Sequence, residues 1–199
     1  MEPFLRKLRQ LNMEHSIFAM ELCLRLDAAC GVQQHLRGSL PVQSPWLGVG
    51  AKWQYYRHIA QVLHDNLHLA ERGCWDYFDD PERAQNDFEM WKNGMLTAEG
   101  ARPDQRVLSL SEPRYITFTM AFLLIRNSPS DLMLRRSCDV PQASLWNRAV
   151  FARLLQDFGR VSFASVYADV SYLIPRDPPW ALTAEDLADP KFHYLRSLV

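Results

Sequence analysis

The sequence is poor in the residues that build the commonest nucleotide and metal sites. It has eight glycines in 199 residues, with no Walker-type phosphate loop and only Gly48-Val49-Gly50 as a glycine turn. Its four cysteines, at positions 23, 30, 74 and 138, show no Cys-x-x-Cys spacing, which zinc ribbons and thioredoxin-like sites require. We therefore expect no cofactor, and reduced thiols in a reducing, cytoplasmic compartment.

An excess of one charge and a long apolar run are also missing. Lysine and arginine number 22 against 23 acidic residues, so no strongly basic face is available for nucleic acid. The most apolar stretch, residues 116–125, is about half of the roughly 20 residues that a membrane helix needs. Residues 1–13 do not have the pattern of a signal peptide. We expect a soluble chain with no nucleic-acid partner and no membrane span.

Hydrophobic residues are plentiful, at 48% of the chain, and 23% of the residues are charged. This composition is typical of a folded core, and the length fits one domain over residues 1–199. Residues 1–13 form an N-terminal extension in this interpretation. Residues 175–199, which begin with a proline-rich stretch, form a C-terminal extended segment and a short helix.

A period of two runs through residues 17–26. Apolar side chains alternate there with other residues, at Phe18, Met20, Leu22, Leu24 and Leu26. Strands place alternate side chains on opposite faces, so the pattern predicts a half-buried strand. Leu22 and Leu24 should be buried, whereas Glu21 and Arg25 should be exposed.

Further elements follow from spacing and end signals. Helices are expected over residues 28–40, over 52–72 with Gly73 as its stop, from Pro81 after an acidic cap, and over 142–158. Strands are expected over residues 115–126 and 165–174. The helix over 142–158 suits a crossover, which would make those two strands parallel if they are neighbours. The predicted fold is α+β, in the order βαααβαβ, with a small sheet of three or more strands and helices mainly on one face.

Three parts of the chain carry a family resemblance. They are the opening SIFAMELCLRLDAACGVQQHLRGSL, the stretch around Cys74-Trp75-Asp76-Tyr77 with the later ERAQNDFEMW, and a closing series of LLQDFGRVS, ADVSYLIP, LTAEDLADP and YLRSL. In this order they resemble the uncharacterised domain-of-unknown-function family 1517, which occurs largely in cyanobacterial and chloroplast lineages. The resemblance covers roughly residues 14–199 and implies no catalytic residues.

His64 and His68 are the sharpest candidates for chemistry. Two histidines four residues apart on a helix can share a metal ion, and Glu71 could be a third ligand. Asp65 stands where zincins have glutamate, and both histidines flank the apolar stripe through Leu63, which also explains them as ordinary flanking residues. A metal-dependent hydrolase is therefore an alternative function.

Two tryptophans in proline-stiffened segments indicate a contact surface. Trp46 follows Ser44-Pro45, and Trp180 follows Pro178-Pro179. A rigid loop that presents tryptophan suits a protein partner, and Arg135 and Arg136 would complement charge at the rim. The favoured function is a non-enzymatic protein–protein interaction domain, a scaffold, adaptor or regulatory subunit. A small-ligand sensor with a pocket between sheet and helices is a further alternative.

Overall fold

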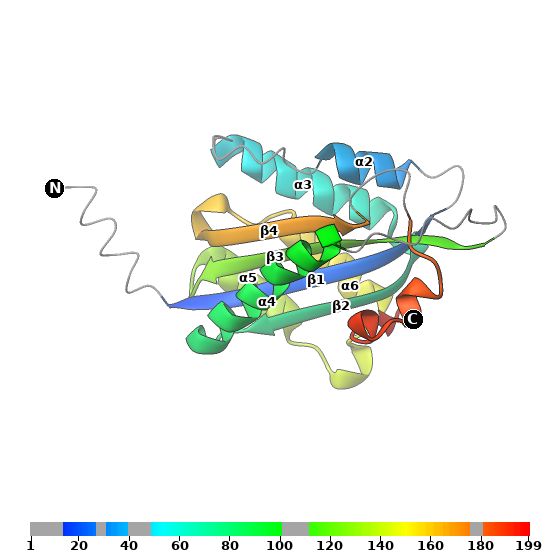
Figure 1. Cartoon of the computed structure of the whole chain (residues 1–199). Helices are drawn as coiled ribbons and strands as arrows, with labels where there is room; N and C mark the ends of the chain where they lie inside the picture. Colours follow the sequence, from blue (N-terminus) through cyan, green and yellow to red (C-terminus); the bar gives the residue numbers. More distant parts are fainter. Residues whose placement is uncertain (1–13, 27–30, 40–48, 101–111, 176–180) are drawn as a thin grey trace.

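A single antiparallel sheet organises the chain. The computed structural model describes residues 14–26, 31–39, 49–100, 112–175 and 181–199. Within these residues five strands pair in the order β4–β3–β1–β2–β5 (Figure 1). Their bounds are β1 His15–Leu26, β2 Ala70–Phe78, β3 Arg114–Ile125, β4 Val166–Ile174 and β5 Arg196–Ser197. The α+β prediction is confirmed, but the sheet is larger than the three strands recognised in the sequence.

β1 is the central strand, and both of its faces are covered. It pairs along its whole length with β3 and over most of it with β2. Leu22 and Leu24 are buried and Arg25 is exposed, as predicted. The prediction for Glu21 is wrong, because its exposed fraction is 0%. The face that carries Glu21 meets other parts of the chain rather than solvent.

The helices divide unequally between the two faces of the sheet. Their bounds are α2 Val32–Ser39, α3 Val49–Asp65, α4 Pro81–Gly100, α5 Pro129–Cys138 and α6 Arg148–Phe158. Buried side chains of α2, α3, α5 and α6 pack with Phe18, Leu22 and Phe122 on one face. On the other face α4 packs Ala84 and Phe88 against Ile17 and Ala19. Figure 1 shows α4 crossing the near face while α5 and α6 lie behind the sheet.

β2 was not predicted, because the helical spacing of Leu63, Leu67 and Ala70 continues past the true end of the helix. The predicted helix over residues 52–72 ends at Asp65, as α3, and a 3₁₀ turn, η1 Leu67–Leu69, leads directly into β2. Gly73 is not a helix stop. It lies inside β2, opposite Leu22 of β1.

The expectation of parallel strands is also wrong. β3 and β4 are neighbours, but they run antiparallel, with Phe118 opposite Leu173. The reason is α5, which none of the elements expected from the sequence includes. Two helices, α5 and α6, therefore separate the strands, so the chain travels out and back before β4 begins beside the end of β3. The predicted βαααβαβ order becomes βααβαβααββ among the described elements.

The C-terminal segment, residues 181–199, completes the face that α4 begins to cover. Leu182 forms an isolated antiparallel bridge with Tyr115, and Leu187, Phe192 and Leu195 pack against Cys23 and Cys74. Thr183 and Asp186 form a capping box: Thr183 N–H donates to Asp186 Oδ2 at 2.7 Å, and Asp186 N–H donates to Thr183 Oγ1 at 3.1 Å. The segment contains two 3₁₀ turns, η4 Asp186–Ala188 and η5 Pro190–Phe192, and ends in β5. None of the described helices is both long enough and apolar enough to cross a membrane.

Candidate functional site

A row of four side chains crosses the sheet on the face covered by α4 and the C-terminal segment. The strand register places Glu21 of β1 opposite Cys74 of β2 on one side and opposite Thr119 of β3 on the other. Thr119 in turn faces Tyr172 of β4. Directly opposed residues have Cβ atoms about 5 Å apart, so the four form a continuous line. We call Cys74, Glu21, Thr119 and Tyr172 the transverse row.

Glu21 lies where the two coverings of this face meet. Ala19, two residues earlier, packs with α4, and Cys23, two residues later, packs with the C-terminal segment. The Tyr194 hydroxyl donates to Glu21 Oε2 at 2.9 Å. Burial raises the pKa of the Glu21 carboxyl, and the side chains of Thr119, Thr117 and Tyr194 oppose that rise in part.

A cavity of about 700 Å³ opens above the transverse row. The sheet contributes Cys74, Asp76, Tyr172 and Ile174 to its wall, while α4 contributes Met90 and Trp91 among others. The remaining lining residues are Trp75, Phe78, Arg83, Asp87, Gly94, Trp146, Lys191, Phe192, Tyr194 and Arg196. The lining therefore combines many aromatic side chains with a few charged ones.

Gly94 sets how closely α4 approaches the sheet. A Cβ atom at this position would lie 2.7 Å from the Tyr172 hydroxyl, so any side chain here would force Tyr172 or α4 to move. The glycine therefore lets Tyr172 reach the helix backbone and form one wall of the cavity. Opposite, Trp91 and Tyr194 meet edge to face with ring centroids 6.2 Å apart.

Several charged residues of the cavity wall already have partners within the protein. Arg83 lies over the Phe78 ring and forms an ion pair with Asp87, Nε to Oδ2 at 3.3 Å. Burial, and then the charge of Asp87, raise the pKa of Asp76. Lys191 lies 3.9 Å from Asp189 and above the Phe192 ring. Arg83, Asp87 and Lys191 are therefore engaged in ion pairs, which leaves the aromatic side chains as the main free surface of the cavity.

Cys74 and Cys23 are poor nucleophiles in this setting. Burial raises the pKa of Cys23 to about 12 and the pKa of Cys74 well above its ordinary value, with the Glu21 charge adding to both shifts. The thiolate is the reactive form of cysteine, and a raised pKa keeps the thiol protonated. The site is better suited to binding than to cysteine chemistry.

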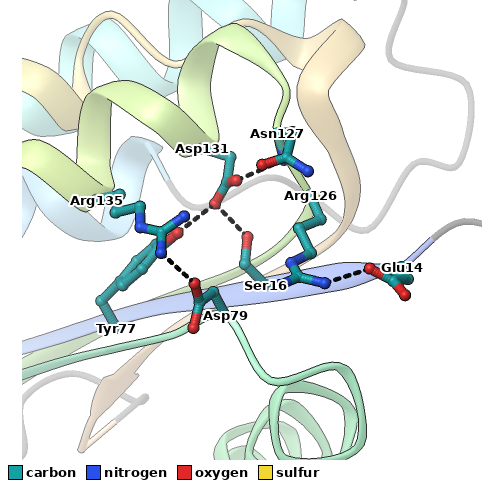
Figure 2. A network of polar contacts seen from close by, with 8 residues as sticks. All are labelled: Glu14, Ser16, Tyr77, Asp79, Arg126, Asn127, Asp131 and Arg135. Carbon is teal, nitrogen blue, oxygen red and sulfur yellow. Dashed lines mark hydrogen bonds and ion pairs between the residues drawn. The ribbon is translucent and has the colours of Figure 1, made fainter.

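A second buried carboxylate, Asp131, belongs to the framework of the fold. Figure 2 shows it accepting hydrogen bonds from the Ser16 and Tyr77 hydroxyls, the latter at 2.6 Å. It also accepts from the backbone N–H of Asn127 at 2.6 Å, and Asn127 has a positive φ of 60°. Ser128 caps the same helix turn of α5. Asp131 therefore fixes the turn between β3 and α5 onto β1 and β2.

The predicted metal ligands lie on different elements. His64 is in the last turn of α3, and His68 is exposed in η1 after the helix has ended, so the two do not share one helix face. Glu71 lies on β2, where it accepts from Arg25 at 3.4 Å and from Tyr115 at 3.1 Å. Among the described residues, no three His, Cys, Asp or Glu side chains lie close enough together to hold a metal ion.

The predicted partner residues divide in a similar way. Arg135 and Arg136 are exposed on α5 rather than in a loop. Arg135 forms an ion pair with Asp79 at 2.6 Å, which Figure 2 includes. Trp46 and Trp180 lie outside the described residues. Contact with a partner through these four residues stays a prediction.

Glu21 and Tyr194 were missed as site residues, although the sequence held one relevant signal. Ala84, Phe88 and Trp91 form an apolar stripe on α4, and such a stripe has to be buried against something. The other face of the first strand was the available surface. That inference would have placed α4 over Glu21.

Comparison with protein-family models, with curated proteins and with solved structures finds no match to this chain. The resemblance to the domain-of-unknown-function family 1517 stays a prediction. The function is therefore argued from the cavity and the transverse row alone.

Proposed function

We propose that this protein binds a small, largely apolar molecule in the cavity between α4, the sheet and the C-terminal segment. The cavity itself carries the proposal. Its volume of about 700 Å³ lies within the roughly 300–1,000 Å³ of typical ligand sites. Aromatic walls with a few convergent polar groups are the usual lining of such sites. This function corresponds to the small-ligand sensor considered from the sequence.

The lining supports recognition of a ring or a branched aliphatic chain. Trp91, Phe192 and Tyr194 bring aromatic surface to the cavity from α4 and the C-terminal segment. Aromatic side chains offer large contact areas with few rotatable bonds, so they lose little freedom when a ligand binds. The high pKa values of Cys74 and Cys23 favour binding over covalent chemistry.

The test uses a neutral, apolar fluorescent probe, N-phenylnaphthylamine, which brightens in apolar surroundings. We expect one probe per chain, with a dissociation constant of micromolar order, near −8 kcal/mol. Quenching of Trp91 and Trp146, which line the cavity, should follow the same curve.

Cys74→Met is the decisive variant, because its longer side chain would fill the cavity above the transverse row. It should weaken probe binding by about tenfold or more, which corresponds to about 1.4 kcal/mol. Cys138→Met is the matched control, since Cys138 lies half-buried on the opposite side of the sheet. Equal binding by wild type and Cys74→Met, or no binding at all, would contradict the proposal.

Contact with a protein partner is a second proposal, and one observation favours it. Arg136 of α5 lines a shallow depression together with Leu132, an exposed leucine, and with Pro129. Arginine is enriched at protein interfaces, whose buried cores are apolar. Leu132→Asp should abolish chemical cross-linking of the purified protein to its partner and leave the melting temperature unchanged.

The described cysteines are free thiols, and a cytoplasmic location stays a prediction.

A further inference from the structure

We propose that the ligand of this cavity carries a protonated amine, and that the amine binds Glu21 after the Tyr194 ring turns aside. This inference rests on the proposed function and names the chemical class of the ligand. It is carried by the polar atoms beneath Tyr194, their incomplete hydrogen bonding, and the aromatic surroundings.

Three buried oxygen atoms lie together without a hydrogen bond of good geometry among the described residues, although both threonine side chains are close enough to Glu21 to lower its pKa. They are Oε1 of Glu21 and the hydroxyl oxygens of Thr117 and Thr119. Thr119 is directly opposite Glu21 in the sheet, and Thr117 is two residues along the same strand, on the same face. Buried polar side-chain atoms are nearly always well paired, and threonine hydroxyls that point to the Glu21 carboxylate would still have oxygen lone pairs free to accept, so the cluster has room for a further donor. A primary ammonium group has three donors and no acceptor, which matches this set.

The charge of Glu21 is also uncompensated. No ion pair to its carboxyl occurs within the described part of the chain, and the cavity arginine and lysine that form ion pairs, Arg83 and Lys191, are engaged with other carboxylates. Burial raises the pKa of Glu21 for the same reason, because the carboxylate has lost water without gaining a cation. An ammonium group placed beside it would supply the missing charge.

The aromatic side chains around Glu21 favour a cation. Tyr194 covers the carboxyl and contacts Trp91 edge to face, while Tyr172 ends the transverse row. Ring faces attract ammonium groups, and more strongly where water is excluded. The same rings would hold the apolar part of the ligand.

Tyr194 separates Glu21 and the two threonines, which are not among the lining residues, from the cavity. Cys74 and Tyr172, the two ends of the transverse row, line the cavity, and so does Tyr194, which lies over the middle of the row. Tyr194 is 42% exposed as a residue, although its hydroxyl reaches a fully buried carboxyl. Its segment is bounded by η5 and by β5, a strand of only two residues. Rotation of this ring would open a direct path from the cavity to Glu21.

Three probes that share a phenyl ring and a short chain test the inference in the wild-type protein. They are phenethylamine, phenethyl alcohol and hydrocinnamate, which are cationic, neutral and anionic at neutral pH. Calorimetric titration should give an affinity for the amine about tenfold or more above that for the alcohol, and weaker binding still for the carboxylate. The Glu21→Gln variant should lose the preference for the amine and keep the affinity for the alcohol.

Tyr194→Phe gives an independent measurement if Glu21→Gln folds poorly. It retains the ring but removes the hydroxyl that donates to Glu21. It should bind the amine more tightly than wild type and bind the alcohol equally well, a split that a purely structural role would not produce.

Equal binding of the three probes, or preference for hydrocinnamate, would overturn the amine inference and leave the cavity proposal standing. Amine preference that survives in Glu21→Gln would overturn it as well. If neither N-phenylnaphthylamine nor any of the three probes binds, both proposals fail.

Discussion

Gly73 is a position where β2 comes close to a side chain of α6, and its replacement by alanine tests the packing of the sheet. A Cβ atom there would lie 2.8 Å from Cε1 of Phe151, 3.1 Å from the Glu21 carbonyl oxygen and 3.1 Å from Cδ2 of Leu22. Phe151 and Leu22 are fully buried, so neither can move into solvent. Overpacking of this kind costs about 1–3 kcal/mol. Alanine recovers about 0.5–1 kcal/mol of backbone entropy, so the net loss should be about 1–2 kcal/mol.

Gly38→Ala is the matched control for this change. Gly38 lies in α2 with no atom within 4 Å of the added methyl group. Alanine in place of glycine within a helix gains up to about 1 kcal/mol. The same substitution should therefore have opposite signs at the two positions, with the variants about 2–3 kcal/mol apart.

Urea unfolding followed by circular dichroism measures both free energies, and the thermal midpoints should differ by roughly 4–10 °C. Phe151→Leu in the Gly73→Ala background should restore part of the loss, because it removes the ring atom that the new methyl meets. A Gly73→Ala protein as stable as wild type would refute the close approach of β2 to α6.

Three further predictions concern the central strand and the buried carboxylates. Leu22→Ala should cost about 2–5 kcal/mol in urea unfolding and Arg25→Ala less than about 0.5 kcal/mol; similar losses would contradict the burial pattern of β1. Burial raises the pKa of Glu21 above 4.5, so the folded chain binds more protons than the unfolded chain above that pH, and stability falls as pH rises through the folded pKa. Glu21→Gln should therefore melt higher than wild type at about pH 8 and equally at about pH 4, whereas an advantage of wild type at the higher pH would reverse the sign of this argument. Asp131→Ala leaves one buried donor, the Ser16 hydroxyl, and two part-buried donors without their acceptor and should cost about 3 kcal/mol in urea unfolding, while Asp131→Asn should recover part of that loss; an unchanged midpoint for the alanine variant would show that the network is dispensable.

Local signals in the sequence were sufficient for several elements. The acidic pair before Pro81 predicted the start of α4, and Asp80 Oδ1 does accept the backbone N–H of Arg83 at 2.8 Å. Alternation predicted β4, whose Val170 and Tyr172 face α4 while Ser171 on the opposite side meets Tyr55 of α3. These features depend on residues within one turn or one strand, which is the range that periodicity describes.

Two elements, β2 and α5, could not be predicted, because their local sequence patterns do not indicate the structure that they form. β2 follows an apolar stripe that keeps helical spacing beyond Asp65, so no local feature marks the change from helix to strand. α5 carries buried polar residues, and its Ser130 and Asp131 become intelligible only through partners on other elements. Hydrogen bonds between residues far apart in the sequence produce no periodic pattern, so periodicity does not reveal such elements.

The burial of Glu21 has the same long-range origin and a further consequence. Alternation showed correctly that Glu21 faces away from Leu22, but α4 and residues 181–199 decide whether that face meets solvent. Stability alone favours an apolar residue here, because a buried carboxylate without a cation loses its hydration and gains little in return. Glu21 thus opposes folding, yet it lies beneath an aromatic cavity. Binding of the proposed amine ligand accounts for a carboxylate at this position. One variant tests both effects. Glu21→Gln should raise the melting temperature above neutral pH and should remove the preference for an amine. A gain in stability together with a loss of binding is what a trade-off between stability and function requires.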